Sequence, residues 1–344
     1  MLEERARRAI RRFGLVTARA AHEAGLDQRD IRLLVASGAW VAIRRGVYVD
    51  EATWAAADEW RGRPRLRARA VHLSLAHPHV FSHDSAAAEL DLPLMPDAHA
   101  WVHVTRTGIT GSRRRRGVAQ HGAPFDGHRV SAATGLPVLS AARTALDIGR
   151  EHGYAAGLAA CDGALRLGVP REELAATAAS MRRWPGIRGA LAAAEDADPG
   201  AENAGESLAR ILVRSLGAGQ PRTQFPVRLE DGSTAWLDLL VGCHAFEFDG
   251  QIKVRSPADG GVAVRGAEKA LWDEKKRERL IRPLGLGISR IVWIDTTSGF
   301  DAARRRLVTE YRQTLAVHGD RLPPALEEYA ARMAPHRARR LRAK

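Results

Sequence analysis

The residues with the clearest potential for chemistry are acidic and lie in segment 234–254, TAWLDLLVGCHAFEFDGQIKV. Two apolar runs flank a four-residue connection at 241–244, and this pattern predicts a β-hairpin. If Leu240 pairs with Ala245, Asp238 lies opposite Glu247. Because like charges in a facing pair repel each other, such a hairpin needs a group that neutralises them.

Strand alternation places four polar residues of the second strand on one face: Glu247, Asp249, Gln251 and Lys253. Hard carboxylate oxygens at this density suit Mg²⁺, or Mn²⁺ in its place. We therefore predict a metal site with Asp238, Glu247 and Asp249 as ligands. The alternative is a solvated acidic hairpin in which Lys253 and Asp249 form an exposed pair of little energetic worth. The apolar residues between the charges favour a covered strand and hence the site, since buried carboxylates without partners are costly.

Composition limits the classes of protein to which this sequence can belong. The formal net charge of +13, from 53 basic and 40 acidic residues, argues for a polyanionic partner, with an anionic membrane surface as the alternative. The richness in Arg and Ala is also compatible with a high-GC genome, which discounts part of that argument. No apolar run is long enough to span a membrane and the N-terminus has no apolar signal core, so we expect a cytoplasmic protein without membrane association. The two cysteines, Cys161 and Cys243, form neither a disulfide framework nor a zinc motif.

Residues 1–52 have the pattern of a DNA-binding domain. Thr17 and Asp27 are predicted to cap two short helices, 17–24 and 28–37. Two β runs, 40–43 and 46–49, then flank a basic turn, an order typical of a winged helix-turn-helix. The residues expected to contact DNA are Gln28, Arg29 and Arg32 in the major groove, and Arg44 or Arg45 on the wing. The alternative is a three-helix protein-interaction module.

The segment 14–50, GLVTARAAHEAGLDQRDIRLLVASGAWVAIRRGVYVD, resembles the N-terminal domain of AbiEi-family antitoxins, which are transcriptional regulators of type IV toxin–antitoxin systems. A similar stretch, LPVLSAARTALD at 136–147, extends the resemblance to about residue 170. The resemblance implies a DNA-binding protein that regulates its own promoter, beside a nucleotidyltransferase-like toxin.

Residues 53–195 are predicted to form a mixed α/β middle domain. A strand leads into a helix at 79–90, a strand follows at 101–104, and helices cover 140–150 and two parts of 171–195. The four arginines at 113–116 could grip phosphate or form a solvated loop. His121, Asp126 and His128 lack ligand spacing on any regular element, so we expect turn residues and no metal there.

Residues 200–318 form the last predicted domain. Asn203 and Glu206 match a capping box that opens a helix, and the expected element order is α-β-β-β-α-β-α, with a charged helix at 267–282. This order resembles the PD-(D/E)xK nuclease fold, and within it the very-short-patch-repair-endonuclease-like domains. The short motifs that carry the resemblance are Glu206-Ser207, Leu237-Asp238, EFDG at 247–250 with Lys253, and the segment 274–280 before a glycine and RIVWID at 290–295.

The resemblance implies roles for individual residues. Asp238 and Glu247 would hold Mg²⁺, Asp249 would be a further ligand or base, and Lys253 would orient water or stabilise the developing phosphorane charge. Glu206 would complete the metal shell, or would only cap its helix. The sequence departs from the usual pattern because Asp249 stands where the family has lysine two residues after the glutamate.

The fold class expected is therefore α/β and multidomain: an N-terminal winged helix-turn-helix, a mixed α/β middle domain, and a C-terminal restriction-endonuclease-like α/β domain. Residues 319–344 form a basic tail, and its part 331–344 is predicted to be disordered and to add non-specific affinity for DNA. The functional hypothesis is a DNA-binding, AbiEi-type transcriptional regulator that carries a nuclease fold. The alternative is an active Mg²⁺-dependent DNA endonuclease targeted by its winged helix. No glycine loop or Ser/His/Asp signature supports a small-molecule enzyme.

Overall fold

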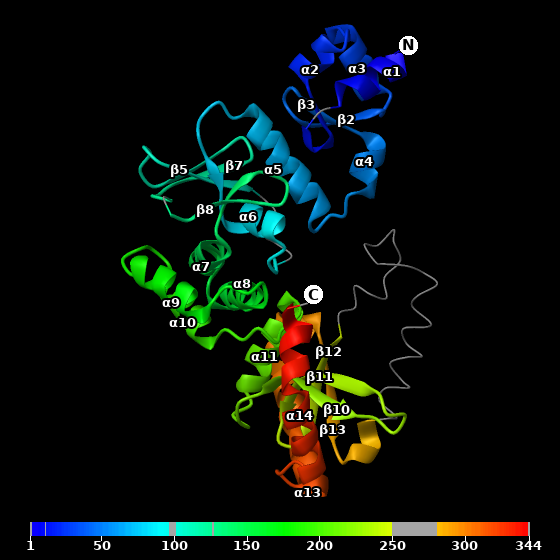
Figure 1. Ribbon diagram of the computed structural model, residues 1–344, viewed down its shortest axis with the longest axis vertical. Helices are drawn as coiled ribbons and strands as arrows, with labels where there is room; N and C mark the ends of the chain where they lie inside the picture. Colours follow the sequence, from blue (N-terminus) through cyan, green and yellow to red (C-terminus); the bar gives the residue numbers. More distant parts are fainter. Residues whose placement is uncertain (1, 11, 96–100, 126, 250–280, 343–344) are drawn as a thin grey trace. The chain divides into compact units, whose positions relative to one another are not determined.

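The computed structural model describes residues 2–10, 12–95, 101–125, 127–249 and 281–342 (Figure 1). The chain is mixed α/β and divides into two compact units, Met1–Glu151 and His152–Lys344. The α/β multidomain class is thereby confirmed. The division between the units falls inside the predicted middle domain of residues 53–195, and the proposed three-domain organisation stays a prediction.

The first unit begins with three helices, α1 (Leu2–Ala9), α2 (Ala18–Glu23) and α3 (Gln28–Ala36), and three strands, β1 (Leu15–Thr17), β2 (Trp40–Arg44) and β3 (Val47–Asp50). The strands form an antiparallel sheet in the order β1-β3-β2. The predicted caps are confirmed. Thr17 Oγ1 accepts a hydrogen bond from Ala20 N at 3.1 Å, and Asp27 forms a capping box with Asp30. Buried Leu26, Ile31 and Trp40 belong to one apolar cluster between these helices and β2.

The rest of the first unit surrounds a six-stranded sheet with the order β6-β7-β5-β4-β9-β8. Its strands are β4 (Val80–Phe81), β5 (Val102–Arg106), β6 (Ser112–Arg115), β7 (Val118–Gly122), β8 (Arg129–Ser131) and β9 (Pro137–Leu139). The helices are α4 (Glu51–Ala56), α5 (Gly62–Ser74), α6 (His83–Leu90) and α7 (Ala141–His152). The predicted strand-to-helix step at 79–90 is confirmed. Three residues of the arginine run, 113–115, lie on an exposed edge strand, β6, and Arg116 lies in the turn that follows.

The second unit opens with three helices. They are α8 (Tyr154–Arg166), α9 (Arg171–Ser180) and α10 (Ile187–Asp196), and α9 and α10 are the two helices expected within 171–195. Helix α11 (Ala204–Arg214) then precedes β10 (Arg222–Arg228), β11 (Thr234–Val241), β12 (His244–Asp249) and β13 (Gly287–Val292). The strand order is β10-β11-β12-β13, with β12 and β13 parallel. The charged helix expected at 267–282 falls almost entirely outside the described residues.

Both faces of this sheet are covered by helices. On one face, Leu212 of α11 and Leu307 of α13 (Phe300–His318) share an apolar cluster with Phe246. On the other face, Leu326 of α14 (Pro324–Arg342) packs in a cluster with Phe225 and Ala245. No helix in the described part of the chain combines the length and apolar character that a membrane crossing requires.

The prediction of a disordered segment at 331–344 is wrong, because its residues up to Arg342 belong to α14, which packs against β10 (Figure 1). Its apolar residues Leu326 and Leu341 are buried. Its basic residues find partners on the same unit. Arg337 Nε donates to the carbonyl oxygen of Thr223 at 3.1 Å, and Arg340 pairs with Glu202 at 3.1 Å. Basic composition suggested a solvated segment, but helical periodicity separates an apolar stripe from the arginines.

Candidate functional site

The acidic hairpin of β11 and β12 has the predicted register. Leu240 pairs with Ala245, and the ladder runs from the pair Val241–His244 to the pair Leu239–Phe246. The connection is therefore two residues, shorter than the four predicted. Phe246 and Phe248 belong to the apolar cluster under α11, as expected. Ile252, Gln251 and Lys253 lie outside the described residues.

Asp238 lies at the point where the ladder between β11 and β12 ends. Its Oδ2 accepts a hydrogen bond from Phe248 N at 2.9 Å, so the side chain replaces a strand-to-strand backbone bond. Its own backbone N–H donates to Glu247 Oε1 at 3.4 Å. The structure thus brings Asp238 and Glu247 together, and half-buried Asp249 follows at the end of β12.

Glu206 joins this acidic set from α11. It is 8% exposed, and its carboxylate accepts hydrogen bonds from Glu202 N at 2.7 Å and Asn203 Nδ2 at 2.6 Å. Asn203 in turn caps the helix by accepting from Glu206 N at 3.0 Å. Burial, followed by the negative charge of Asp238, raises the pKa of Glu206 to about 8. Glu206 therefore both completes a helix cap and lies close enough to Asp238 to respond to its charge.

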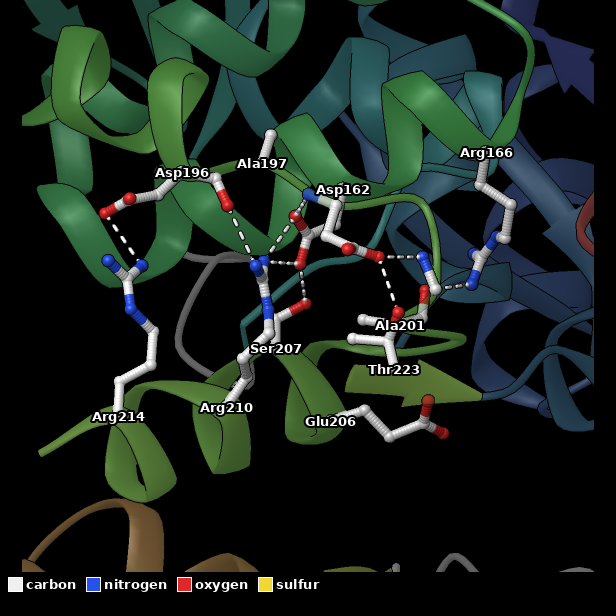
Figure 2. A network of polar contacts seen from close by, with 12 residues as sticks. Asp162, Arg166, Asp196, Ala197, Ala201, Glu206, Ser207, Arg210, Arg214 and Thr223 are labelled. Atoms are coloured by element: carbon white, nitrogen blue, oxygen red, sulfur yellow. Dashed lines mark hydrogen bonds and ion pairs between the residues drawn. The ribbon is translucent and has the colours of Figure 1, made fainter. Parts of the chain in front are cut away.

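A buried polar network fixes α11 in place (Figure 2). Arg210 Nη2 donates to both carboxylate oxygens of Asp162 at 2.7 Å, and Ser207 Oγ donates to the same carboxylate at 2.7 Å. Figure 2 shows that the Glu206 side chain leaves the same helix but lies apart from this network. A further constraint is Gly205, where a Cβ would lie 2.1 Å from the ring of Phe248. Close packing of α11 on β12 therefore depends on glycine beside Glu206.

Gln224 of β10 is a member of this site that sequence reasoning missed. Its Nε2 lies 3.4 Å from Asp238 Oδ1. Its side chain is 2% exposed, and its Oε1 is buried with no hydrogen-bond partner among the described residues. Its φ of +47° is unusual for a residue other than glycine. The amide nitrogen faces Asp238, and the buried Oε1 is a hard oxygen of the type that binds divalent cations. A lone glutamine in a strand gives no sequence signal of such a role.

Histidines form a separate group of potential metal ligands. Among the described residues, one such group consists of His83, His103 and His121. One ligand atom of each side chain lies within 4.8 Å of those of the other two. The Mg²⁺ or Mn²⁺ site at the acidic residues stays a prediction. The prediction that His121 is a turn residue is wrong, because it lies on β7. Two other histidines lie beside it. His128 lies in a turn, as expected, and Asp126 is outside the described residues.

A second feature is a basic cleft of about 820 Å³ in the first unit. The described residues that line it include four arginines and no carboxylate: Arg44, Arg45, Arg67 and Arg116. Arg44 Nη1 donates to the carbonyl oxygen of Arg116 at 3.0 Å, so this predicted wing residue lies at the cleft wall. Burial, and then the charge of Arg116, lower the pKa of Arg44. The cleft is therefore a region of concentrated positive charge.

The predicted recognition helix presents its polar side chains to solvent. Gln28, Arg29 and Arg32 of α3 are exposed. An apolar neighbour, Leu33, is 54% exposed on the same helix. Trp101 is a cleft residue that sequence reasoning missed, and it lies under the guanidinium of Arg114 at 5.6 Å.

No protein-family model matches this chain, and no curated protein matches it. Among solved structures, a crystal structure of the RV2827C protein from Mycobacterium tuberculosis is similar at 16% sequence identity. The similarity covers 60% of this chain and 78% of that chain, with a TM-score of 0.37. Likeness at this level carries no functional inference, so function must be inferred from the residues of this chain.

Proposed function

We propose that this chain is a DNA-binding regulatory protein and that its first unit holds the DNA. The observation that carries the proposal is the cleft lined by four arginines without a carboxylate among its described residues. Burying positive charge beside positive charge is unfavourable, and the lowered pKa of Arg44 reflects this cost. A polyanion that enters the cleft would relieve the repulsion and release its own counterions. The formal charge of +13 acts in the same direction.

The elements around the cleft support a winged helix-turn-helix as the part that recognises the DNA sequence. Helices α2 and α3 precede the β2–β3 hairpin, and α3 exposes Gln28, Arg29 and Arg32. Amide and guanidinium groups are the side chains that read base edges in the major groove. Arg45, exposed at the hairpin turn, is placed to contact phosphate. The resemblance to AbiEi antitoxins supports regulation of the protein's own promoter and a nucleotidyltransferase-like toxin as partner.

The test measures fluorescence anisotropy of the full chain with a duplex from upstream of its own gene. Removing two cleft charges with Arg44→Ala and Arg116→Ala should weaken binding to any duplex. It should also reduce the dependence of affinity on salt, by about one unit of log–log slope for each phosphate that the variant no longer neutralises. The matched control is Arg7→Ala, which removes one exposed charge from α1. Equal salt slopes for the wild type and the cleft variant would contradict the proposal.

A specific observation favours a second candidate function, a Mg²⁺-dependent DNA endonuclease. Burial and the charge of nearby Asp238 raise the pKa of Glu206, and Gln224 Nε2 lies 3.4 Å from Asp238 Oδ1. A divalent cation would neutralise that set. Helix α11, the three antiparallel strands and parallel β13 also agree with the element order of a PD-(D/E)xK fold. In this reading the ion would polarise the phosphate and lower the pKa of an attacking water.

The endonuclease candidate is tested with supercoiled and mismatched DNA in the presence of Mg²⁺ or Mn²⁺. Asp238→Asn keeps the shape of the side chain and removes its charge, and it should abolish cleavage. The control is Asp301→Asn, an exposed carboxylate on α13. Cleavage that persists in the Asp238 variant would mean that the acidic site does not catalyse it, and would contradict this candidate. An inactive wild type that still binds its upstream duplex would leave the regulator as the function.

A further inference from the structure

We propose that His83, His103 and His121 form a binding site for a transition-metal ion of the zinc class. The site lies in the first unit and is separate from the acidic residues proposed to hold Mg²⁺. One potential ligand atom from each of the three side chains lies within 4.8 Å of the other two. A set made only of imidazole nitrogens suits Zn²⁺, Co²⁺ or Ni²⁺, whereas Mg²⁺ prefers oxygen ligands.

Three neighbouring elements hold the histidines. His103 lies on β5 and His121 on β7, and these strands pair in parallel with His103 beside Ala119 and Thr105 beside His121. His83 opens α6 directly after β4, which pairs with β5 on the opposite side from β7. Two bonds join that junction to β5, since Ser82 N donates to His103 O at 3.2 Å and His103 N donates to Ser85 Oγ at 2.9 Å. The backbone therefore fixes the positions of the Cα atoms that carry the three rings.

Each ring has an oxygen partner at one nitrogen. His83 Nδ1 lies 3.0 Å from Ser82 Oγ, His121 Nδ1 lies 3.0 Å from Ser112 Oγ, and His103 Nε2 lies 3.6 Å from a carboxylate oxygen of Asp84. Metal-binding histidines generally donate one ring N–H to such a partner, which orients the other nitrogen toward the ion. This arrangement assigns Nε2 of His83, Nδ1 of His103 and Nε2 of His121 as the ligand atoms.

The distances between the rings agree with this assignment. His103 Nδ1 and His121 Nε2 are 3.0 Å apart. Two nitrogens that each lie about 2.0–2.1 Å from a tetrahedral zinc ion are separated by roughly 3.3 Å, so a small movement admits the ion. The His83 ring stacks on that of His121 with centroids 4.1 Å apart.

Two observations indicate a ligand site and not only a packed core. Thr105, opposite His121, is 1% exposed, and its Oγ1 is buried with no hydrogen-bond partner among the described residues. A water or anion at a fourth coordination position would supply that partner. His83 also has a φ of +47°, a strained conformation that persists only where surrounding contacts impose it.

The experiment titrates the EDTA-treated full chain with Zn²⁺ by calorimetry and with Co²⁺ by visible absorption. We expect one ion per chain and a Co²⁺ spectrum typical of low coordination number with nitrogen ligands. His121→Phe keeps an aromatic ring of similar size and removes both nitrogens, and it should weaken binding by more than about 100-fold. Ser112→Ala removes only the outer partner and should weaken it by about 10–100-fold. The control, His77→Ala, changes an exposed histidine of the same unit and should bind normally.

Hydrogen exchange of the wild type keeps the test decisive if His121→Phe does not fold. Zn²⁺ should slow exchange in peptides that cover β4–α6, β5 and β7, since the ion would join these elements. No ion bound to the EDTA-treated wild type, or binding that is unchanged in both His121→Phe and Ser112→Ala, would overturn the proposal. Zn²⁺-dependent protection confined to the second unit would also overturn it.

Discussion

The Glu206→Gln variant should change how stability depends on pH. The folded chain raises the pKa of this carboxyl from 4.5 to about 8, with burial as the first cause and Asp238 as the second. Folding therefore takes up a proton at neutral pH. The stability that protonated Glu206 contributes is fully present below about pH 4.5 and is lost progressively as the pH rises to about 8.

The size of the effect follows from the two pKa values. Each tenfold change in proton affinity corresponds to about 1.4 kcal/mol, so a pKa raised from 4.5 to about 8 corresponds to roughly 5 kcal/mol. Structural relaxation and water penetration reduce that figure, and we expect a loss of roughly 2–5 kcal/mol across this range. Glutamine has the same shape, stays neutral, and keeps an oxygen that can accept from Glu202 N or Asn203 Nδ2.

The assay is urea unfolding at pH 5.5, 7.0 and 8.5, followed by tryptophan fluorescence, to which Trp184, Trp236, Trp272 and Trp293 of residues 152–344 contribute. Wild type should lose stability relative to Glu206→Gln as the pH rises. The control is Glu195→Gln, an exposed carboxylate on α10. If Mg²⁺ binds at this site, it should restore wild-type stability at pH 8.5 and have little effect on the glutamine variant. Parallel pH profiles for wild type and Glu206→Gln would contradict the assignment of a raised pKa to this carboxyl.

Three further variants test the second unit. Arg210→Met leaves the carboxylate of Asp162 buried without its cation, and unfolding in urea should show a loss of about 3–5 kcal/mol. Gly205→Ala places a methyl group 2.1 Å from the ring of Phe248, and a loss of about 1–3 kcal/mol in the same assay is expected; unchanged stability would mean that α11 can shift freely. His244 is 2% exposed between Thr314 and Ser289, and burial lowers its pKa to about 4. Its contribution to stability is present above about pH 6.5 and is lost as the pH falls toward 4, by roughly 3 kcal/mol, so His244→Gln should flatten the thermal-melting profile over that range.

Local features of the fold could be predicted from the sequence. Thr17, Asp27 and Asn203 each cap a helix, because short polar side chains before an apolar run accept hydrogen bonds from the first turn. The register of the acidic hairpin also follows from alternation around a tight turn. In both cases the interacting residues are close in sequence.

Features that depend on distant pairing could not be predicted. His83, His103 and His121 meet only because β7 pairs with β5 in parallel while β6 lies at the sheet edge. No sequence spacing encodes that strand order. Gln224 joins the acidic residues through a distorted backbone that a strand pattern does not reveal. The basic charge of α14, taken alone, predicts disorder. The segment is helical because it packs on β10, which is distant in sequence.

DNA binding by the first unit is tested most directly by hydrogen exchange of the full chain with a duplex from upstream of its own gene. Peptides that contain α3, the β2–β3 turn at Arg44 and Arg45, and the cleft wall at Arg116 should exchange more slowly when the duplex is bound. Peptides from α9 and α10 should be unchanged. Protection of α3 and the arginine cleft is the result that the proposal predicts. Protection confined to the second unit, or no protection at saturating DNA, would contradict it.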